Sequence, residues 1–295
     1  MKDYIEGYRS YLSNVKKTSA NTIEAYIRDV AQFSSYCTDN GINSVNKVNE
    51  NSIRKYLEYL DFLGKSEATK TRIVASIRCY FKYLASIEIV KSNPTSAIKF
   101  KKAEKKLPGV LEAGEIMSLL SQPDTSEYKG IRDKAMLELL YATGIKVSEL
   151  IELNISDINT QIGILHIRNS KNERIIPIYP SAAKHINDYI TMVRSVIIQD
   201  DTDVLFANMS GQPMSRQGFW KIIKYYADKA GIDKDITPHT LRHSFAAHLL
   251  ENGARLKDIK EMLGHSDISS TQVYANLLKS KYISSYAKFH PLAKK

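Results

Sequence analysis

Cysteines and long hydrophobic runs are scarce in this chain of 295 residues. It has only two cysteines, Cys37 and Cys79, and neither a CxxC nor an HExxH pattern. We therefore expect no disulfide framework and no metal site, and we expect both cysteines to be small core residues of helices. No apolar run approaches the roughly 18 residues of a membrane span, and the first residues lack the hydrophobic core of a signal peptide. These absences predict a cytoplasmic protein without a membrane segment.

Acidic residues are the scarcer charged class. The chain has 32 Asp and Glu against 42 Lys and Arg, a formal net charge of +10. This balance favours a polyanionic partner such as nucleic acid. Residues 91–107 hold six lysines and one glutamate, a net +5 of the total +10. This segment is either a solvated linker or a basic tether that contacts DNA phosphates. Its lysines are Lys91, Lys99, Lys101, Lys102, Lys105 and Lys106.

The first 90 residues carry apolar stripes at helical spacing, which predicts a domain of four or five short helices. The stripes are Ile23, Tyr26, Ile27, Val30 and Phe33; Ile53, Tyr56, Leu57 and Leu60; and Ile73, Ile77, Tyr80, Phe81 and Leu84. Opposite the third stripe lie Arg72, Arg78 and Lys82. That polar face suits either an ordinary amphipathic surface helix or a helix that contacts DNA.

Residues 108–295 combine helical patterns with one strand pair. Runs rich in β-branched residues at 164–168 and 174–178 predict a hairpin, joined by a connection that carries Lys171. Between 216 and 226 we expect Trp220 in the core, and Arg216 and Lys221 available to DNA. Helices are expected at 112–121, 131–142, 181–198, 215–230, 238–251 and 255–263. The predicted fold class is mainly α, with a small antiparallel sheet in the second domain.

The stretch TPHTLRHSFAAHLLENG, residues 237–253, should form a helix. Thr237 can cap it, Pro238 suits its first position, and Asn252-Gly253 can end it. His239 and Arg242 are three residues apart and so share a face near the helix start. A cationic pair at a helix N-terminus is either a solvated polar turn or a site for an anion such as phosphate.

Five features of the second domain occur in a fixed order, although each alone is weak. They are TGIKVSEL (143–150), Lys171, HTLR (239–242), LGH (263–265) and Tyr274 in TQVYAN. The ordered set resembles the catalytic signature of tyrosine recombinases, and the chain is similar to their bacterial Xer subfamily over essentially its whole length. The similarity includes TSANTIEAY (18–26) and Asn-Pro at 93–94, and it is most specific over 239–276.

This resemblance implies a helical core-binding domain over residues 1–90, a basic linker over 91–107 and a catalytic domain over 108–295, clamped around duplex DNA. Tyr274 would attack a phosphodiester and leave a 3′-phosphotyrosine, which conserves the bond energy without a cofactor. Arg242 and His265 would stabilise the non-bridging oxygens, and His239 would accept a proton. Lys171 would protonate the leaving 5′-oxygen.

One position departs from the family pattern. Lys146 stands where the family has arginine, so the charge is kept but the planar two-pronged donor is lost. Losing one such donor would cost about 2.7–4 kcal/mol of transition-state stabilisation. The substitution, natural or engineered, is expected to impair cleavage and to leave DNA binding intact.

The other histidines of the motif helix, His243 and His248, are expected to have packing or supporting roles. By resemblance, the partners are a double-stranded recombination site and a homo- or hetero-tetramer on paired sites. A septum-associated DNA translocase would act in chromosome dimer resolution. An apolar stripe in the tail 281–295 would either fold back or dock on a neighbouring protomer. Alternatives are a DNA-binding protein that has lost catalysis and a type IB topoisomerase-like enzyme.

Overall fold

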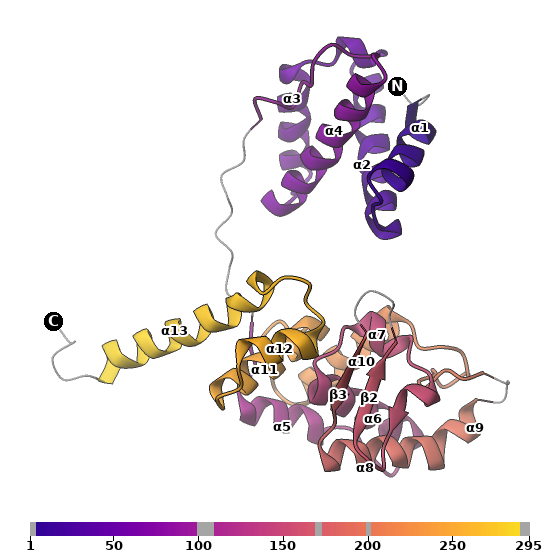
Figure 1. Cartoon of the computed structure of the whole chain (residues 1–295), viewed down its shortest axis with the longest axis vertical. Helices are drawn as coiled ribbons and strands as arrows, with labels where there is room; N and C mark the ends of the chain where they lie inside the picture. The colour runs from indigo at the N-terminus through magenta and orange to yellow at the C-terminus, as the bar shows by residue number, and fades with distance from the viewer. Residues whose placement is uncertain (1–3, 99–108, 169–172, 199–201, 290–295) are drawn as a thin grey trace. The chain divides into compact units, whose positions relative to one another are not determined.

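The computed structural model describes residues 4–98, 109–168, 173–198 and 202–289 (Figure 1). The chain divides into two compact units, residues 1–105 and 106–295. No helix within the described ranges is long and apolar enough to cross a membrane.

The first unit is helical, as predicted. Its helices are α1 (Ile5–Ser10), which continues as a π turn (Tyr11–Val15), α2 (Ala20–Asp39), a 3-10 turn (Val45–Lys47), α3 (Glu50–Phe62) and α4 (Glu67–Ser86). Asn49 caps α3, because its Oδ1 accepts the backbone N–H of Ser52 at 3.0 Å. The three predicted stripes form the core of this unit, with Tyr26 and Leu57 only partly buried. Helices α2 and α4 are each 20 residues long, so they are longer than the short helices expected.

The second unit is built around α6 (Tyr128–Thr143), which is buried along most of its length and packs against α8 and α11. Its other helices are α5 (Ala113–Ser121), α7 (Val147–Ile151), α8 (Pro180–Tyr189), α9 (Ser195–Ile197), α10 (Arg216–Lys229), α11 (Pro238–Glu251), α12 (Leu256–Leu263) and α13 (Ser269–Phe289). A π turn (Ile190–Arg194) joins α8 to α9, and a 3-10 turn (Ile155–Asp157) precedes the sheet. Each helix expected from the sequence of this unit is present, within a few residues at its ends.

A three-stranded antiparallel sheet lies in the same unit, in the order β1 (Ile158–Asn159), β2 (Ile164–Ile167), β3 (Arg174–Pro177). The predicted hairpin is β2–β3, in which Leu165 pairs with Ile176, and both of these side chains are fully buried. Strand β1 was not predicted, because two residues are too few to show an alternating pattern.

The structure corrects two predictions about helix faces and ends. Trp220 is 45% exposed rather than in the core, because the inward face of α10 is formed by Phe219 and Ile223. Lys224 lies over the indole, with Nζ 5.6 Å from the ring centroid. Residues 281–289, which the sequence analysis placed in a separate tail, form the end of the single helix α13, whose sequence contains no glycine or proline to interrupt it.

Candidate active site

Helix α11 begins where the sequence predicted. The backbone N–H of Thr240 donates to Thr237 Oγ1 at 3.3 Å, that of Thr237 donates to Thr240 Oγ1 at 3.0 Å, and Pro238 occupies the first turn. This start leaves His239 exposed and points Arg242, one turn later, into the protein.

Arg242 is a buried cation of the site, with only 4% of its surface exposed. Its Nη1 donates to the carbonyl oxygen of Gly144 at 2.6 Å, and its Nη2 donates to that of Leu263 at 2.7 Å. Burial lowers the pKa of this guanidinium, but arginine stays charged in proteins. Two of its five hydrogens are used in this way, so the group is held in place and can still donate to a phosphate.

Gly144 ends α6 in the left-handed conformation, with φ at +58°. A Cβ here would lie 2.3 Å from Cδ1 of Phe245, so this close approach of α6 to α11 requires glycine. Two residues later, Lys146 is half-buried and immediately precedes α7, and its backbone N–H donates to Glu149 Oε2 at 2.8 Å. The TGIKVSEL motif thus brings Lys146 and the carbonyl that holds Arg242 to one turn.

Glu149 and Arg174 form a buried ion pair that joins this turn to β3. Arg174 donates from Nη1 to Oε1 at 3.1 Å and from Nη2 to Oε2 at 2.9 Å, and the two side chains are only 8% and 9% exposed. Burial opposes ionisation of Glu149, but the bonds from Arg174 and from the N–H of Lys146 outweigh it and hold the pKa of the carboxyl below its usual range. Arg174 Nε also donates to the carbonyl oxygen of Met262 at 2.7 Å. The guanidinium packs on Gly264, where a Cβ would lie 2.7 Å from Nη1.

His265 follows this glycine and is held by Thr271, whose Oγ1 lies 3.0 Å from Nδ1. Burial, and then the charges of Arg242 and Lys146, lower the pKa of His265 to about 4. The imidazole is therefore neutral at physiological pH, and with Nδ1 engaged it can offer Nε2 to a phosphate oxygen. The cations that add to this effect of burial also create a positive field that attracts an anion.

Tyr274, on α13, is 1% exposed and packs with Phe245, Ile259 and Leu263. Burial raises the pKa of its phenol, against an opposing effect of Arg242. Its Oη lies 2.8 Å from Nδ1 of His243. The sequence predicted only a packing or supporting role for His243 and did not predict this contact. The structure shows that His243 contacts the predicted nucleophile itself. His248, the other histidine treated in this way, lies with Nδ1 2.9 Å from Oη of Tyr141.

Most of the predicted catalytic residues thus lie together in one unit. Arg242 joins the segments that carry Lys146 and His265, and the rings of His239 and His243 are 6.3 Å apart between centroids. Lys171 lies outside the described residues. Sequence reasoning missed Glu149, Arg174 and Thr271, as well as the contact of His243. The four-residue spacing of His243 from His239, on one helix face, was the available signal for the last.

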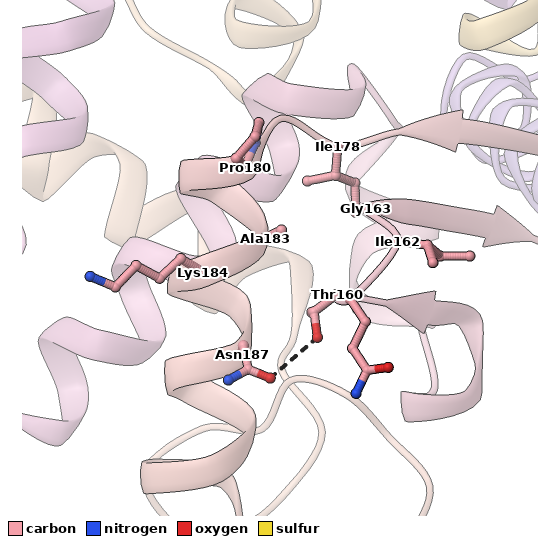
Figure 2. Close-up of a pocket in the computed structure, with 9 residues that line it drawn as sticks. Thr160, Ile162, Gly163, Ile178, Pro180, Ala183, Lys184 and Asn187 are labelled. Atoms are coloured by element: carbon pink, nitrogen blue, oxygen red, sulfur yellow. Dashed lines mark hydrogen bonds between the residues drawn. The ribbon is translucent and has the colours of Figure 1, made fainter.

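Of two surface hollows in the second unit, one is lined by a predicted catalytic residue and the other is not. One, of about 650 Å³, opens between β3 and α12, and its wall includes Arg174, Gly264 and His265. Figure 2 shows the other, of about 580 Å³, between the β1–β2 turn and α8, where Thr160 Oγ1 lies 3.2 Å from Asn187 Oδ1. Its lining contains none of the predicted catalytic residues. The hollow beside His265 is therefore the one connected to the chemistry.

The residues predicted to contact DNA differ in their surroundings. Arg72 and Lys82 are both exposed on α4, and Arg72 also forms an ion pair with the buried Asp29. Arg78 donates to Thr95 Oγ1 and to the carbonyl oxygens of Thr95 and Ile98, so it holds the first part of the predicted linker against α4. On α10, Arg216 and Lys221 are both exposed. Lys101, Lys102, Lys105 and Lys106, here called the linker lysines, lie outside the described residues.

Two family models match this chain. Residues 109–281 match the phage integrase family, and residues 5–87 match the phage integrase N-terminal SAM-like domain. Tyrosine recombinase XerD of Staphylococcus epidermidis is 43% identical over 295 residues, covering 99% of this chain and all of that protein. XerD of Staphylococcus haemolyticus is 42% identical over the same length.

Solved structures agree with this fold. XerA recombinase is 26% identical with a TM-score of 0.55, over 98% of both chains. XerH site-specific recombinase bound to a palindromic difH substrate, in a post-cleavage complex, has a TM-score of 0.78 at 19% identity, over 96% of this chain and 84% of that one. Together, the cationic cluster around a tyrosine, the two matched domains and the full-length identity show that this chain belongs to the phage integrase family, as a tyrosine recombinase of the Xer type.

Proposed function

We propose that this protein is a site-specific recombinase that cleaves and rejoins DNA through Tyr274, in the resolution of chromosome dimers. The observation that carries the proposal is that Arg242 is bonded to the segments that bear Lys146 and His265, and that its charge also acts on the buried Tyr274. The named XerD relatives support the role in chromosome maintenance.

In the proposed reaction, Oη of Tyr274 forms a bond to the scissile phosphorus as the bond from phosphorus to the 5′-oxygen breaks. The phenol loses its proton, with His239 as the predicted acceptor, and Lys171 supplies a proton to the leaving oxygen. Arg242 and His265 donate to the non-bridging oxygens, where negative charge develops. The reverse attack by a 5′-hydroxyl rejoins the strand and releases the tyrosine.

Lys146 is proposed to keep a positive charge near that phosphate without the paired donors of an arginine. Its charge reaches the site, because it contributes to the low pKa of His265. We infer that cleavage is slowed relative to an arginine-containing site, whereas DNA binding, which depends on many phosphate contacts, is retained.

The DNA complex is proposed to use both units as a clamp around the duplex. Residues 1–90 would act as the core-binding domain, 91–107 as a basic tether and 108–295 as the catalytic domain. Arg72, Lys82, Arg216 and Lys221 are exposed enough to meet phosphates, whereas Arg78 would act by holding residues 95–98. On paired sites we propose a homo- or hetero-tetramer in which the tail 281–295 docks on a neighbouring protomer, with a septum-associated translocase as activator.

A nicked suicide substrate tests the chemistry. The chain should form a denaturation-resistant adduct with the DNA, and Tyr274→Phe should abolish the adduct while binding the same site. An adduct that persists in Tyr274→Phe would show that another residue is the nucleophile. A requirement for two sites in strand exchange separates the recombinase from a type IB topoisomerase-like enzyme, which would relax supercoiled DNA without pairing sites.

A further inference from the structure

Within the described part of the chain, His243 contacts the reacting atom of the proposed nucleophile. Its Nδ1 lies 2.8 Å from Oη of Tyr274, within the range of a good hydrogen bond. The contact joins α11 to α13 across 31 residues of sequence. Tyr274 is almost completely buried, so this hydrogen bond forms where water cannot replace it.

We propose that His243 is a positioning residue for the nucleophile, in which Nδ1 accepts the hydrogen bond of the Tyr274 phenol and aims Oη toward the phosphate held by Arg242. The proposal rests on the proposed function of Tyr274. It adds a residue to the reaction, because the sequence motif pointed to His239 rather than His243 as the histidine that serves the tyrosine.

The charges around the contact support this direction of the hydrogen bond. Burial, followed by the charges of His239 and Arg242, lowers the pKa of His243 to about 4. A neutral imidazole with its hydrogen on Nε2 has a free lone pair on Nδ1. Burial also raises the pKa of Tyr274, so the phenol keeps its proton and can donate it into the hydrogen bond. So weak a base is a poor final acceptor of that proton, which is why we assign His243 to positioning.

His239 cannot replace His243 in this role in the described geometry. It is exposed on the first turn of α11, and its ring centroid is 6.3 Å from that of His243. The two imidazoles therefore form a line from the surface to the buried phenol. His239, at the exposed end, remains the proposed proton acceptor, and His243 is placed to orient the tyrosine.

The same helix supplies a matched control. His248 is also half-buried, and its Nδ1 lies 2.9 Å from the phenol oxygen of Tyr141. Tyr141 has no proposed role in the reaction. Substitutions of His248 therefore remove an equivalent histidine–tyrosine bond and report the structural cost alone.

The experiment compares His243→Asn with His243→Gln, and His248→Asn with His248→Gln. An asparagine amide can place its oxygen near the position of Nδ1, whereas a glutamine amide extends toward that of Nε2. DNA affinity is measured by gel shift on a half-site, and the rate of adduct formation by single turnover on a nicked suicide substrate at saturating protein. Thermal unfolding, followed by the fluorescence of Trp220, shows whether each variant is folded.

We expect His243→Gln to slow adduct formation on the order of 10²-fold, the effect of a misplacement of about 1 Å, with unchanged affinity. His243→Asn should recover most of the rate, and both His248 variants should cleave like the unsubstituted chain. Equal rates in His243→Asn and His243→Gln, or faster adduct formation in either, would overturn the positioning role. If the unsubstituted chain forms no adduct at all, or Tyr274→Phe still forms one, the proposed function itself fails.

Discussion

Replacing Arg174 by methionine should destabilise the second unit more than any change to a surface ion pair. Arg174 holds three segments at once: Glu149 at the start of α7, β3 on which it lies, and the carbonyl of Met262 before the LGH motif. Methionine keeps an unbranched apolar stem in the place of the arginine stem, but it is shorter and cannot donate a hydrogen bond. The substitution therefore leaves a buried carboxylate without its cation.

The expected loss is about 3–5 kcal/mol in the free energy of unfolding, the usual result of removing one partner of a buried pair. Both side chains are less than 10% exposed, so solvent can do little to compensate. The double variant Glu149→Gln, Arg174→Met should recover much of this loss, because the unpaired charge is gone. Arg255→Met removes the pair with Asp258, in which the arginine is 79% exposed, and should have a far smaller effect.

The stability lost in Arg174→Met should depend on pH, and the pKa of Glu149 determines in which direction. In the unsubstituted chain the pKa of Glu149 is lowered, so the contribution of the pair is complete above the unfolded value of ~4.3 and is lost as pH falls through the lower folded value. In Arg174→Met, burial should instead raise the pKa of Glu149 above that value. The penalty is then largest at neutral pH, and it should shrink as pH falls toward about 5.

Urea unfolding followed by fluorescence provides the assay. The chain has one tryptophan, Trp220 on α10, so the signal reports on the second unit alone. The difference between Arg174→Met and the unsubstituted chain is measured at several pH values, with Arg255→Met as the control. A loss no larger than that of Arg255→Met, or a difference that grows as pH falls, would refute the role assigned to the buried pair.

Three further predictions concern the DNA complex. Lys146→Arg should raise the single-turnover cleavage rate, by up to roughly 10²–10³ if one donor is restored, with half-site affinity unchanged; equal rates would show that lysine suffices. Neutralising the linker lysines should weaken binding to all sequences and flatten the slope of log K against log salt by about 0.9 for each DNA phosphate that the protein no longer neutralises; an unchanged slope would make the segment a solvated linker. Deleting residues 281–295 should leave binding to one half-site intact but reduce cooperative binding to two, as measured by gel shift; full cooperativity would argue against docking between protomers.

The sequence predicted those parts of the fold that depend on local pattern. The apolar stripes of the first unit were found in its core, and the cap at Thr237 marked the start of α11, because both follow from spacing along one helix. The hairpin β2–β3 was predicted for the same reason, since its strands are adjacent in sequence. The family motif then placed Lys146, His239, Arg242, His265 and Tyr274 in one unit, which spacing alone could not have done.

The parts that were missed depend on contacts between distant segments. The bond between His243 and Tyr274 needs α13 to lie against α11, and that between Arg174 and Met262 spans 88 residues. Trp220 was assigned to the core from its hydrophobic character, although Phe219 and Ile223 already fill the inward face of α10. A single sequence shows that an apolar residue can be buried. Packing decides which of two neighbouring apolar residues is buried.

The supports of the site indicate which part of it is rigid before DNA arrives. Arg242 and Arg174 are held by backbone carbonyls and by Glu149, and these bonds form only when α6, α11, α12 and β3 have packed. Close packing at Gly144 and Gly264 leaves those elements little freedom to shift, because added atoms would meet Phe245 and Arg174. The cationic pocket is therefore preorganised by the core of the unit.

Tyr274 instead packs in a small separate cluster with parts of α11 and α12, and its hydroxyl is buried. Because this hydroxyl is buried, a phosphate can reach it only after local opening around Tyr274, and we expect the segment that bears the proposed nucleophile to be the part of the site that responds to DNA.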